Sequence, residues 1–415
     1  MKNQMLLWSS FICCILLFTQ CDDVAPIEIT DDSPILALSD QYKVIDAENA
    51  LGFQTLKNLN ETEADENIFI SPLSISLAFG MAYNGANGTT QEAMQEALEL
   101  NGMSLEQVNN GYKGLMNRLS QLDEAVQFDI ANSVWYDEGF APMIHETFLD
   151  NCSNYYSSET NPLNFHDPTS KDIINAWVNE HTNGKIPTIL DNISPDEVMF
   201  LINAIYFKGD WKYTFNEENT TTATFYGEDG TTSQYERMMM ETSLPYFQND
   251  LFQAVDLAYG EEDMYSMSLF LPKDNVNVHD IVAALDGDAW ENWTSGFSNN
   301  EVTLMMPKFK LEYEKTLNET LTDLGMGIAF TPNADFTNIA DANLYITKVK
   351  HKTFIEIDEL GTEAAAVTSI GIGITSVNPN TPPTVNINKP YFFVIREKQS
   401  NAILFMGKMM QPPME

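Results

Sequence analysis

The hydrophobic and polar positions change their period about halfway along the chain. In the first half, apolar residues recur at helical spacing over residues 42–59, and residues 73–83 are apolar almost all round, as in a buried helix. In the second half, residues 302–314 alternate, with Pro307 as an interruption, and residues 344–357 and 391–405 also have strand patterns. Helices followed by strands, without a clear linker, predict one α+β domain with a large, mostly antiparallel sheet.

One long connection near the C-terminus has an unusual composition for a loop. Residues 359–380 join two strand patterns, and a connection of this length in a compact domain usually carries a function or is disordered. Every residue from 362 to 369 except Glu363 is small or β-branched, and isoleucines then alternate with small residues up to Ile374. This period of two predicts a loop that can become a buried strand; an ordinary edge hairpin is the alternative.

The composition argues against several kinds of partner. The 415 residues include 21 Lys and Arg against 60 Asp and Glu, which gives a net charge of -39. A field of this sign repels phosphate backbones and anionic lipids, and no basic cluster suits a heparin-like polyanion. We therefore expect no nucleic acid and no heparin as partners, and the sequence has no spacing typical of a metal or cofactor site.

The N-terminus has the pattern of a targeting segment. Lys2 precedes an apolar stretch, residues 5–18, that is too short for a membrane span. The stretch ends at Cys21 and resembles a bacterial lipoprotein signal, although Gln20 replaces the usual small residue. We expect a signal peptide at 1–20, a lipid on Cys21, a flexible acidic tether at 21–40 and the folded domain at 41–415.

The expected location follows from this signal. The protein would be exported and anchored by its lipid to the bacterial outer membrane or cell surface, with simple secretion as the alternative. Of the four cysteines, Cys152 is the one that neither leaves with the signal nor carries lipid. It has no companion for a disulfide, so we expect a small buried or half-buried residue and a fold stabilised by its core.

An enzyme is not expected. The five histidines are scattered along the chain, and neither HExxH nor G-x-S-x-G occurs. Carboxylates are so abundant that any proposed acid and base pair would be chance. No nearby pattern supplies a base that would make Cys152 a catalytic thiol.

A set of motifs, in order and in register, resembles the serpins, the family of serine protease inhibitors and their relatives. The match extends from about residue 40 to residue 412. It is strongest at residues 67–78, 183–186, 201–211, 306–309, 351–366, 389–395 and 404–408. With the lipoprotein signal, the chain resembles a bacterial lipoprotein serpin. The resemblance implies three β-sheets, with a large central and mostly antiparallel sheet, surrounding helices and an exposed reactive-centre loop.

The resemblance also implies a mechanical function on a metastable fold. A serpin presents its loop to a protease, which cleaves it and forms an acyl-enzyme, and the cleaved loop then inserts into the central sheet and traps the protease covalently. The positions that would face the core, alternate residues from Thr362 to Ile374, carry no charge, which favours inhibition. The alternative is a non-inhibitory serpin that acts as a surface binding or chaperone protein. We expect a monomer, with loop–sheet polymers possible.

Motif matching assigns residues to three regions that would control insertion. The hinge comprises Glu359, Gly361, Thr362, Glu363, Ala364, Ala365 and Ala366. The shutter, a polar cluster below the centre of the sheet, comprises Ser71, Ser74, Asn203 and His351. The breach, at the top of the sheet, comprises Trp211, Lys308 and Glu359, where we expect Glu359 to pair with Lys308.

Two counts locate the reactive bond. Counting forward from Gly361 places it at Thr375–Ser376, and counting back from Pro390 places it at Pro379–Asn380. The first is preferred because proline beside the cleavage point disfavours most proteases. No Lys or Arg occurs between residues 359 and 388, which argues against trypsin-like targets. Ile, Thr and Val suit elastase- or subtilisin-like serine proteases, or papain-like cysteine proteases.

Overall fold

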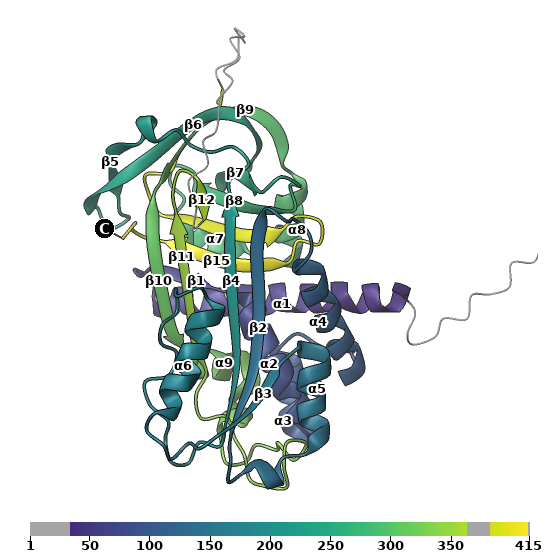
Figure 1. The fold of residues 1–415 in the computed structure, drawn as a ribbon. Coiled ribbons are helices and arrows are strands. Elements are labelled where there is room, and N and C mark those ends of the chain that lie inside the picture. The colour runs from purple at the N-terminus through teal and green to yellow at the C-terminus, as the bar shows by residue number, and fades with distance from the viewer. Residues whose placement is uncertain (1–33, 363–381, 414–415) are drawn as a thin grey trace, which may run out of the picture.

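The computed structural model describes residues 34–362 and 382–413, drawn in colour in Figure 1. Its helices are α1 (Pro34–Thr62), α2 (Pro72–Gly85), α3 (Gly88–Ala97), α4 (Leu105–Leu119), α5 (Glu146–Tyr156), α6 (Ser170–His181), α7 (Val278–Ala284), α8 (Gly287–Ser295) and α9 (Asn318–Leu321). Its strands are β1 (Ile68–Ile70), β2 (Val126–Asp137), β3 (Glu159–Leu163), β4 (Met199–Asp210), β5 (Thr221–Tyr226), β6 (Thr232–Gln248), β7 (Phe252–Tyr259), β8 (Tyr265–Pro272), β9 (Ser298–Pro307), β10 (Phe309–Thr316), β11 (Lys350–Ile357), β12 (Gly361–Thr362), β13 (Thr384–Asn386), β14 (Tyr391–Glu397) and β15 (Ile403–Met409).

The sheet that carries the candidate site has six strands in the order β10-β11-β12-β4-β2-β3. Its neighbours are antiparallel except β2 and β3, which are parallel. Its long strands stand upright in Figure 1, with α6 packed in front through Trp177 and Ile174 against Ile202 and Ala204 of β4. The α+β class and the mostly antiparallel sheet predicted from the sequence are confirmed.

The remaining strands form one nine-stranded sheet instead of two separate sheets. Its main path is β1-β15-β14-β8-β7-β6-β9-β13, and β5 pairs with β6. Strand β6 pairs with β9 along Arg237–Tyr246 and with β7 over its last three residues. It therefore joins the strands β1-β15-β14-β8-β7 to the strands β9 and β13 in a single sheet. In the described ranges the strands therefore form two hydrogen-bonded sheets, where the sequence predicted three.

Two strand predictions also change. The alternating residues 302–314 divide between the two sheets, because β9 ends at Pro307 and β10 begins at Phe309. Proline has no N–H to donate to a ladder, which suits a strand end. Residues 344–349 were expected to continue a strand, but the strand β11 begins at Lys350. The earlier residues lie beside a cavity, described below, instead of beside a partner strand.

The N-terminal boundary differs as well. Helix α1 begins at Pro34, inside the range 21–40 expected as a tether, and Asp40 is buried and accepts a hydrogen bond from Gln107 Nε2 at 3.0 Å. The signal peptide and Cys21 lie outside the described residues. No helix in the described ranges is long and apolar enough to span a membrane.

Cys152 is fully buried on α5, as predicted. Burial raises the pKa of its thiol to about 12. A thiol that stays protonated at neutral pH is a poor nucleophile, so this residue belongs to the core.

Candidate functional site

The candidate site is a slot between β4 and β11. The two-residue strand β12 enters it from the top and is antiparallel to both neighbours, with Thr362 opposite Ile357 of β11 and Gly209 of β4. Because adjacent strands lie about 4.8 Å apart, the strands β4 and β11 are separated there by roughly 9.6 Å, the room for one strand. Below Thr362, the described residues contain no ladder between β4 and β11.

The two strands that border the slot are parallel to each other, because β12 is antiparallel to both. A chain that continued β12 downward would therefore meet an antiparallel neighbour on each side. Antiparallel pairing is the more stable of the two arrangements per residue. The direction of β12 thus suits further strand addition between β4 and β11.

The hinge is held by a tight turn at the top of the slot. Asp358 Oδ1 accepts hydrogen bonds from the backbone N–H groups of Leu360 at 2.8 Å and Gly361 at 3.1 Å. Trp211 N donates to Leu360 O at 2.6 Å. A Cβ atom at Gly361 would lie 2.2 Å from Gly209 O, so a side chain there would force the two backbones apart.

The ion pair predicted for the breach is present in the structure. Lys308 Nζ lies 2.8 Å from Glu359 Oε2, and Thr220 Oγ1 donates to Glu359 Oε1 at 2.7 Å. The Glu359 side chain is 6% exposed. Burial by itself raises the pKa of this carboxyl, but the hydrogen bonds from Lys308 and Thr220 outweigh it and place the pKa below its usual value. Glu359 is thus a buried, charged anchor at the base of the loop.

Trp211 anchors the same turn through an aromatic stack. Its Nε1 donates to Asp358 O at 2.9 Å, and its ring stacks on Tyr259 with centroids 4.4 Å apart and planes 17° apart. The Tyr259 hydroxyl hydrogen-bonds Thr362 Oγ1 at 2.7 Å. Tyr259 and Thr220 were missed from the sequence, which contains no local signal for contacts between such distant segments. Asp358 was also missed, although its bonds to Leu360 and Gly361 are local.

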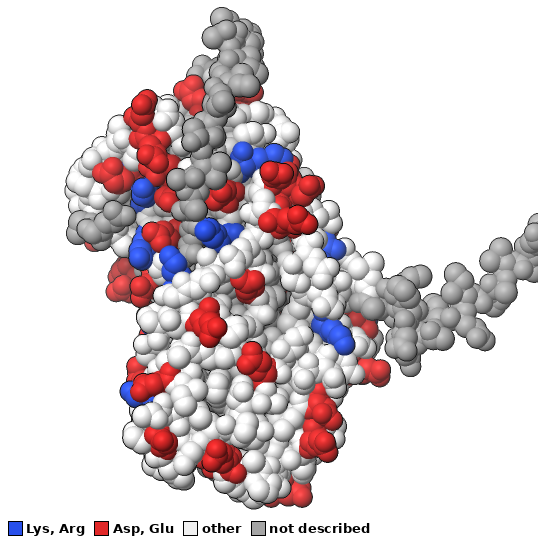
Figure 2. All heavy atoms as spheres, viewed as in Figure 1, with Lys and Arg blue, Asp and Glu red and all other residues white. Residues whose placement is uncertain are grey.

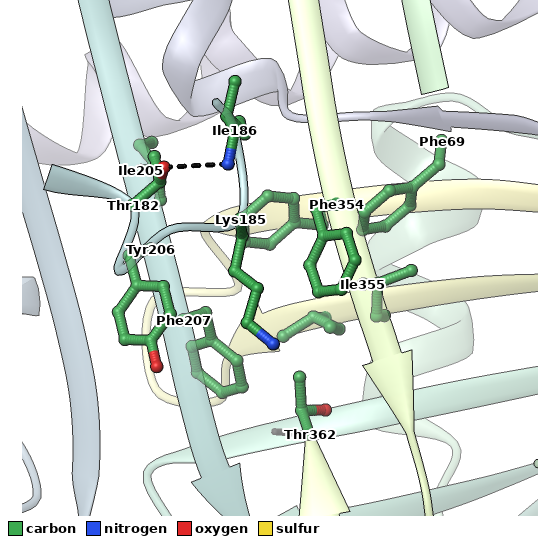
Figure 3. Close-up of a pocket in the computed structure, with 12 residues that line it drawn as sticks. Phe69, Thr182, Lys185, Ile186, Ile205, Tyr206, Phe207, Phe354, Ile355 and Thr362 are labelled. Atoms are coloured by element: carbon green, nitrogen blue, oxygen red, sulfur yellow. Dashed lines mark hydrogen bonds between the residues drawn. The ribbon is translucent and has the colours of Figure 1, made fainter. Parts of the chain in front are cut away.

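Lys185 occupies the upper part of the slot. Figure 3 shows its side chain between Tyr206 and Phe207 of β4 and Phe354 of β11, pointing toward Thr362. Its Nζ lies 4.8 Å from the centre of the Phe354 ring and 3.2 Å from Glu356 Oε2. A cavity of about 20 Å³ remains at this level. We expect a strand that extends β12 to displace this lysine.

Part of the predicted shutter is a connected network. His351 is buried, and its Nε2 accepts a hydrogen bond from Ser71 N at 3.1 Å. Ser71 Oγ accepts from Ser74 N at 3.2 Å, as the cap of α2, and donates to Leu404 O at 2.7 Å. Burial lowers the pKa of His351 to about 4, so the imidazole is neutral at physiological pH.

Asn203 does not join this network. Its Nδ2 donates to Asn132 Oδ1 at 2.9 Å, and Asn132 Nδ2 donates to Tyr156 O at 2.7 Å. Asn203 Oδ1 is buried and has no hydrogen-bond partner in the part of the chain that the structure describes. The predicted shutter residues therefore form two separate hydrogen-bonded groups in the described structure, because Asn203 and His351 lie on the two sides of the slot.

The lower part of the slot opens into a cavity of about 490 Å³. Its walls are β4, the segment 342–351 and the apolar side chains Ile75, Phe79 and Ala82 of α2. Asn203 and His351 both line it. At its lower end, Thr347 Oγ1 donates to Glu197 Oε1 at 3.3 Å across the slot.

The predicted residues Glu363, Ala364, Ala365 and Ala366 lie outside the described residues, as do both candidate bonds, Thr375–Ser376 and Pro379–Asn380. Figure 2 shows carboxylates spread over the visible face and lysine and arginine side chains gathered mainly in its upper half, without a continuous basic surface on that face. Among the described ranges, no group of His, Cys, Asp and Glu could hold a metal ion.

Comparison with known proteins identifies the family. The family model for serpins, serine protease inhibitors, matches residues 46–412. Serpin B10 of Homo sapiens is 33% identical over 395 residues, which cover 88% of this chain and 98% of the relative. Iripin-2 of Ixodes ricinus is 31% identical, covering 89% of this chain and 94% of the relative. The chain belongs to the serpin family.

Solved structures agree with this assignment. The native-state crystal structure of the thermophilic serpin tengpin is 34% identical, with a TM-score of 0.79, and the match covers 88% of this chain and 94% of tengpin. Human thyroxine-binding globulin in complex with its ligand is 25% identical, with a TM-score of 0.80, covering 90% of this chain and 100% of that protein. The serpin fold predicted from the motifs is confirmed.

Proposed function

We propose that this serpin is an inhibitory one, a suicide substrate whose loop is cleaved and inserted into the six-stranded sheet with the protease attached. The observation that carries the proposal is β12, which is already hydrogen-bonded between β4 and β11 at the mouth of a strand-wide slot. The chain leaves β12 directly into the reactive-loop segment, so insertion needs no new point of entry.

The loop composition supports insertion. Thr362 faces the core and is 3% exposed, so the even-numbered residues from Ala364 to Ile374 take the inward face if the strand continues. None of them is charged or a proline. Insertion would therefore bury no unpaired charge and would leave a backbone N–H at every position for the two open strand edges.

The proposed reactive bond is Thr375–Ser376, with Pro379–Asn380 as the alternative. The residues before Ser376 are Ile374 and Thr375, which suit the small apolar pockets of elastase- and subtilisin-like proteases. Papain-like cysteine proteases are a further target class, since they also form an acyl-enzyme. Their covalent complex with the chain is the partner state that we propose.

The test is to mix the protein with elastase, subtilisin, papain and trypsin separately and to separate the products on a denaturing gel. A band at the summed mass that survives detergent supports inhibition, and mass spectrometry of the released C-terminal peptide identifies the bond. Elastase with its active-site serine blocked is the control and should give no such band. Clean cleavage by elastase, subtilisin and papain, without a covalent band, would refute the proposal.

The second candidate is a non-inhibitory binding protein. It is favoured by the similarity to thyroxine-binding globulin, a serpin whose solved complex contains a small ligand. In that case the cleaved chain would form no covalent complex, and titration with thyroxine would change the tryptophan fluorescence saturably. A covalent band with elastase and no response to thyroxine would exclude this candidate.

We also propose that the chain is exported and lipid-anchored through Cys21, with secretion as the alternative. The short apolar stretch before Cys21 and the absence of basic residues after Lys2 in that stretch support the proposal. The test is to express the chain with labelled palmitate and to partition it in detergent. The Cys21→Ser variant should lose both the label and the detergent phase, and equal behaviour of the two would refute lipidation.

A further inference from the structure

We propose that Glu48 of α1 is a pH-sensitive latch. At neutral pH its carboxyl is held as a neutral acid between α1, α2 and α4. In alkaline medium it loses its proton, and the buried charge loosens α1 from the rest of the fold. The latch lies outside the slot and the reactive loop, so it is independent of the proposed function.

The carboxyl of Glu48 is enclosed by close helix contacts on both sides. Glu48 is 0% exposed, and neither carboxyl oxygen has a hydrogen-bond partner in the described part of the chain. One turn earlier, α4 approaches so closely that a Cβ atom at Gly111 would lie 2.7 Å from Val44 Cγ1. One turn later, a Cβ atom at Gly52 would lie 2.5 Å from Pro72 Cγ of α2. Since residues four apart share a helix face, these contacts leave the carboxyl no route to solvent along that face.

Glu48 belongs to a polar stripe on α1 with a spacing of seven residues. Gln41, Glu48 and Thr55 recur every two turns, roughly 10.5 Å apart, and therefore share one face of the helix. All three are buried, and each has a side-chain nitrogen or oxygen atom that lacks a hydrogen-bond partner among the described residues. Glu48 is the member of this stripe that can ionise. A change of charge on the stripe is therefore a change at Glu48.

The groups that face Glu48 supply no counter-charge. From α4, Tyr112 is buried, and burial together with the nearby Glu48 raises the pKa of its hydroxyl, which is therefore neutral. From α2, Ser76 lies beside the Tyr112 hydroxyl and cannot ionise. From β15, the N–H of Ile403 is already bound to Asn49 Oδ1 at 3.0 Å. Burial therefore raises the pKa of the Glu48 carboxyl well above its usual value, and the N–H of Ile403 offsets only part of this rise.

Other charged and titratable groups that reach α1 act on other residues of the helix or of the turn that follows it. They are Glu291 on Asp46, Glu99 on Gln54, Asp323 on Asn58, His279 and Lys408 on Asn60, and Tyr313 and Lys315 on Glu63. Each of these contacts lies on a different residue from Glu48, so none of them neutralises its carboxylate.

The neutral acid is the form of Glu48 that suits this environment. An isolated carboxylate in apolar surroundings is far more costly than a neutral polar group. In the unfolded chain the carboxyl has its usual pKa of 4.5, so folding takes up one proton between this value and the higher folded pKa. The contribution to stability is complete below about pH 4.5 and is lost as the pH rises toward the folded pKa. Above that pKa, water can reach the charge only if α1 separates from α4 or α2.

The titration is tested with Glu48→Gln, which keeps the size of the side chain and removes the ionisable group. The melting temperatures of the variant and the wild type are compared from about pH 5 to about pH 9. Because one proton is released on unfolding, the unfolding constant of the wild type should rise by up to about tenfold per pH unit relative to the variant. Glu61→Gln, an exposed position on the same helix, is the matched control and should follow the wild type. Parallel curves for Glu48→Gln and the wild type would overturn the inference.

The protonated acid and the loosening of α1 are tested separately. The infrared spectrum of the wild type at neutral pH should contain the C=O stretch of a protonated carboxylic acid, and this band should disappear in alkaline medium. The wild type alone decides this point, so the test holds even if Glu48→Gln fails to fold, and absence of the band would overturn the inference. At the same alkaline pH, hydrogen exchange should be faster in α1 of the wild type than in α1 of Glu48→Gln, with equal exchange in α6. Equal exchange in α1 would refute the loosening.

Discussion

Reversing the charge of Glu359 should release the base of the loop. The wild-type carboxylate is bound by Lys308 at 2.8 Å and by Thr220 at 2.7 Å, and its side chain is 6% exposed. In Glu359→Lys both hydrogen bonds are lost, and two ammonium groups face each other. We expect the hinge to detach and the slot to accept strands from other copies, so that the variant polymerises.

The size of the effect follows from the burial of the pair. Removing one partner of a buried ion pair costs about 3–5 kcal/mol. The Lys308 side chain is 34% exposed, so solvent screens part of the interaction and the lower end, about 3 kcal/mol, applies. Since each 1.4 kcal/mol corresponds to a factor of ten, the detached hinge should become about 100-fold more populated.

The assay is size-exclusion chromatography after incubation well below the melting transition. Glu312→Lys, which adds the same charge at an exposed position of β10, is the matched control and should stay monomeric. The double variant Glu359→Lys with Lys308→Glu recreates an ion pair and should recover part of the stability. If Glu359→Lys elutes as a monomer for as long as the wild type, the reasoning is refuted.

The pH dependence gives an independent check on the same anchor. Because the pKa of Glu359 lies below its usual value in the fold, its stabilising effect is present at neutral pH and is lost as the pH falls through the folded pKa, below about 4.5. Wild type should therefore become prone to polymerise in acid. In the Glu359→Lys variant this acid-dependent increase should be missing.

Three further predictions concern the slot. Gly361→Ala should destabilise the protein by about 1–3 kcal/mol in thermal unfolding, because its Cβ would overlap a backbone carbonyl, whereas Gly287→Ala, with no atom within 4 Å of the new Cβ, should not. The buried His351 has a pKa of about 4 in the folded protein, so its contribution to the free energy of unfolding is constant above pH 6.5 and falls by up to about 3 kcal/mol as the pH drops to 4. The melting temperature of His351→Gln should therefore vary less with pH over this range than that of the wild type. Parallel curves for the two proteins would contradict this prediction. Lys185→Met should speed loop insertion about five-fold in stopped-flow tryptophan fluorescence, because it removes about 1 kcal/mol of cation–π and ion-pair interaction. Lys310, whose Nζ lies 5.3 Å from the centre of the same Phe354 ring, provides the control, and Lys310→Met should not change the rate.

Much of the site could be predicted because its signals are local. The apolar residues 73–83 predict a buried helix, and α2 is buried along most of its length as expected. The glycine at 361 follows from the close approach of two backbones at that position. The pairing of Glu359 with Lys308 was predicted from motif positions, and the structure contains it.

The errors and omissions arise where long-range packing decides. Thr220 and Glu359 are 139 residues apart, and no periodicity relates them. Asn203 was grouped with His351 by motif, but the two residues lie on opposite sides of the slot and bond to different groups. In the same way, residues 344–349 have a strand pattern but lack a partner strand in the described structure.

By itself, the sequence determined most of the helices and strands, the buried faces and the absence of charge from the inward positions of the loop, because these depend on side chains a few residues apart. Only the tertiary structure decided that β4 and β11 stand one strand apart, that Lys185 occupies the upper gap and that a cavity lies below His351. The reason is physical: whether two strands pair depends on the free energy of everything packed around them, which no short stretch of the chain contains.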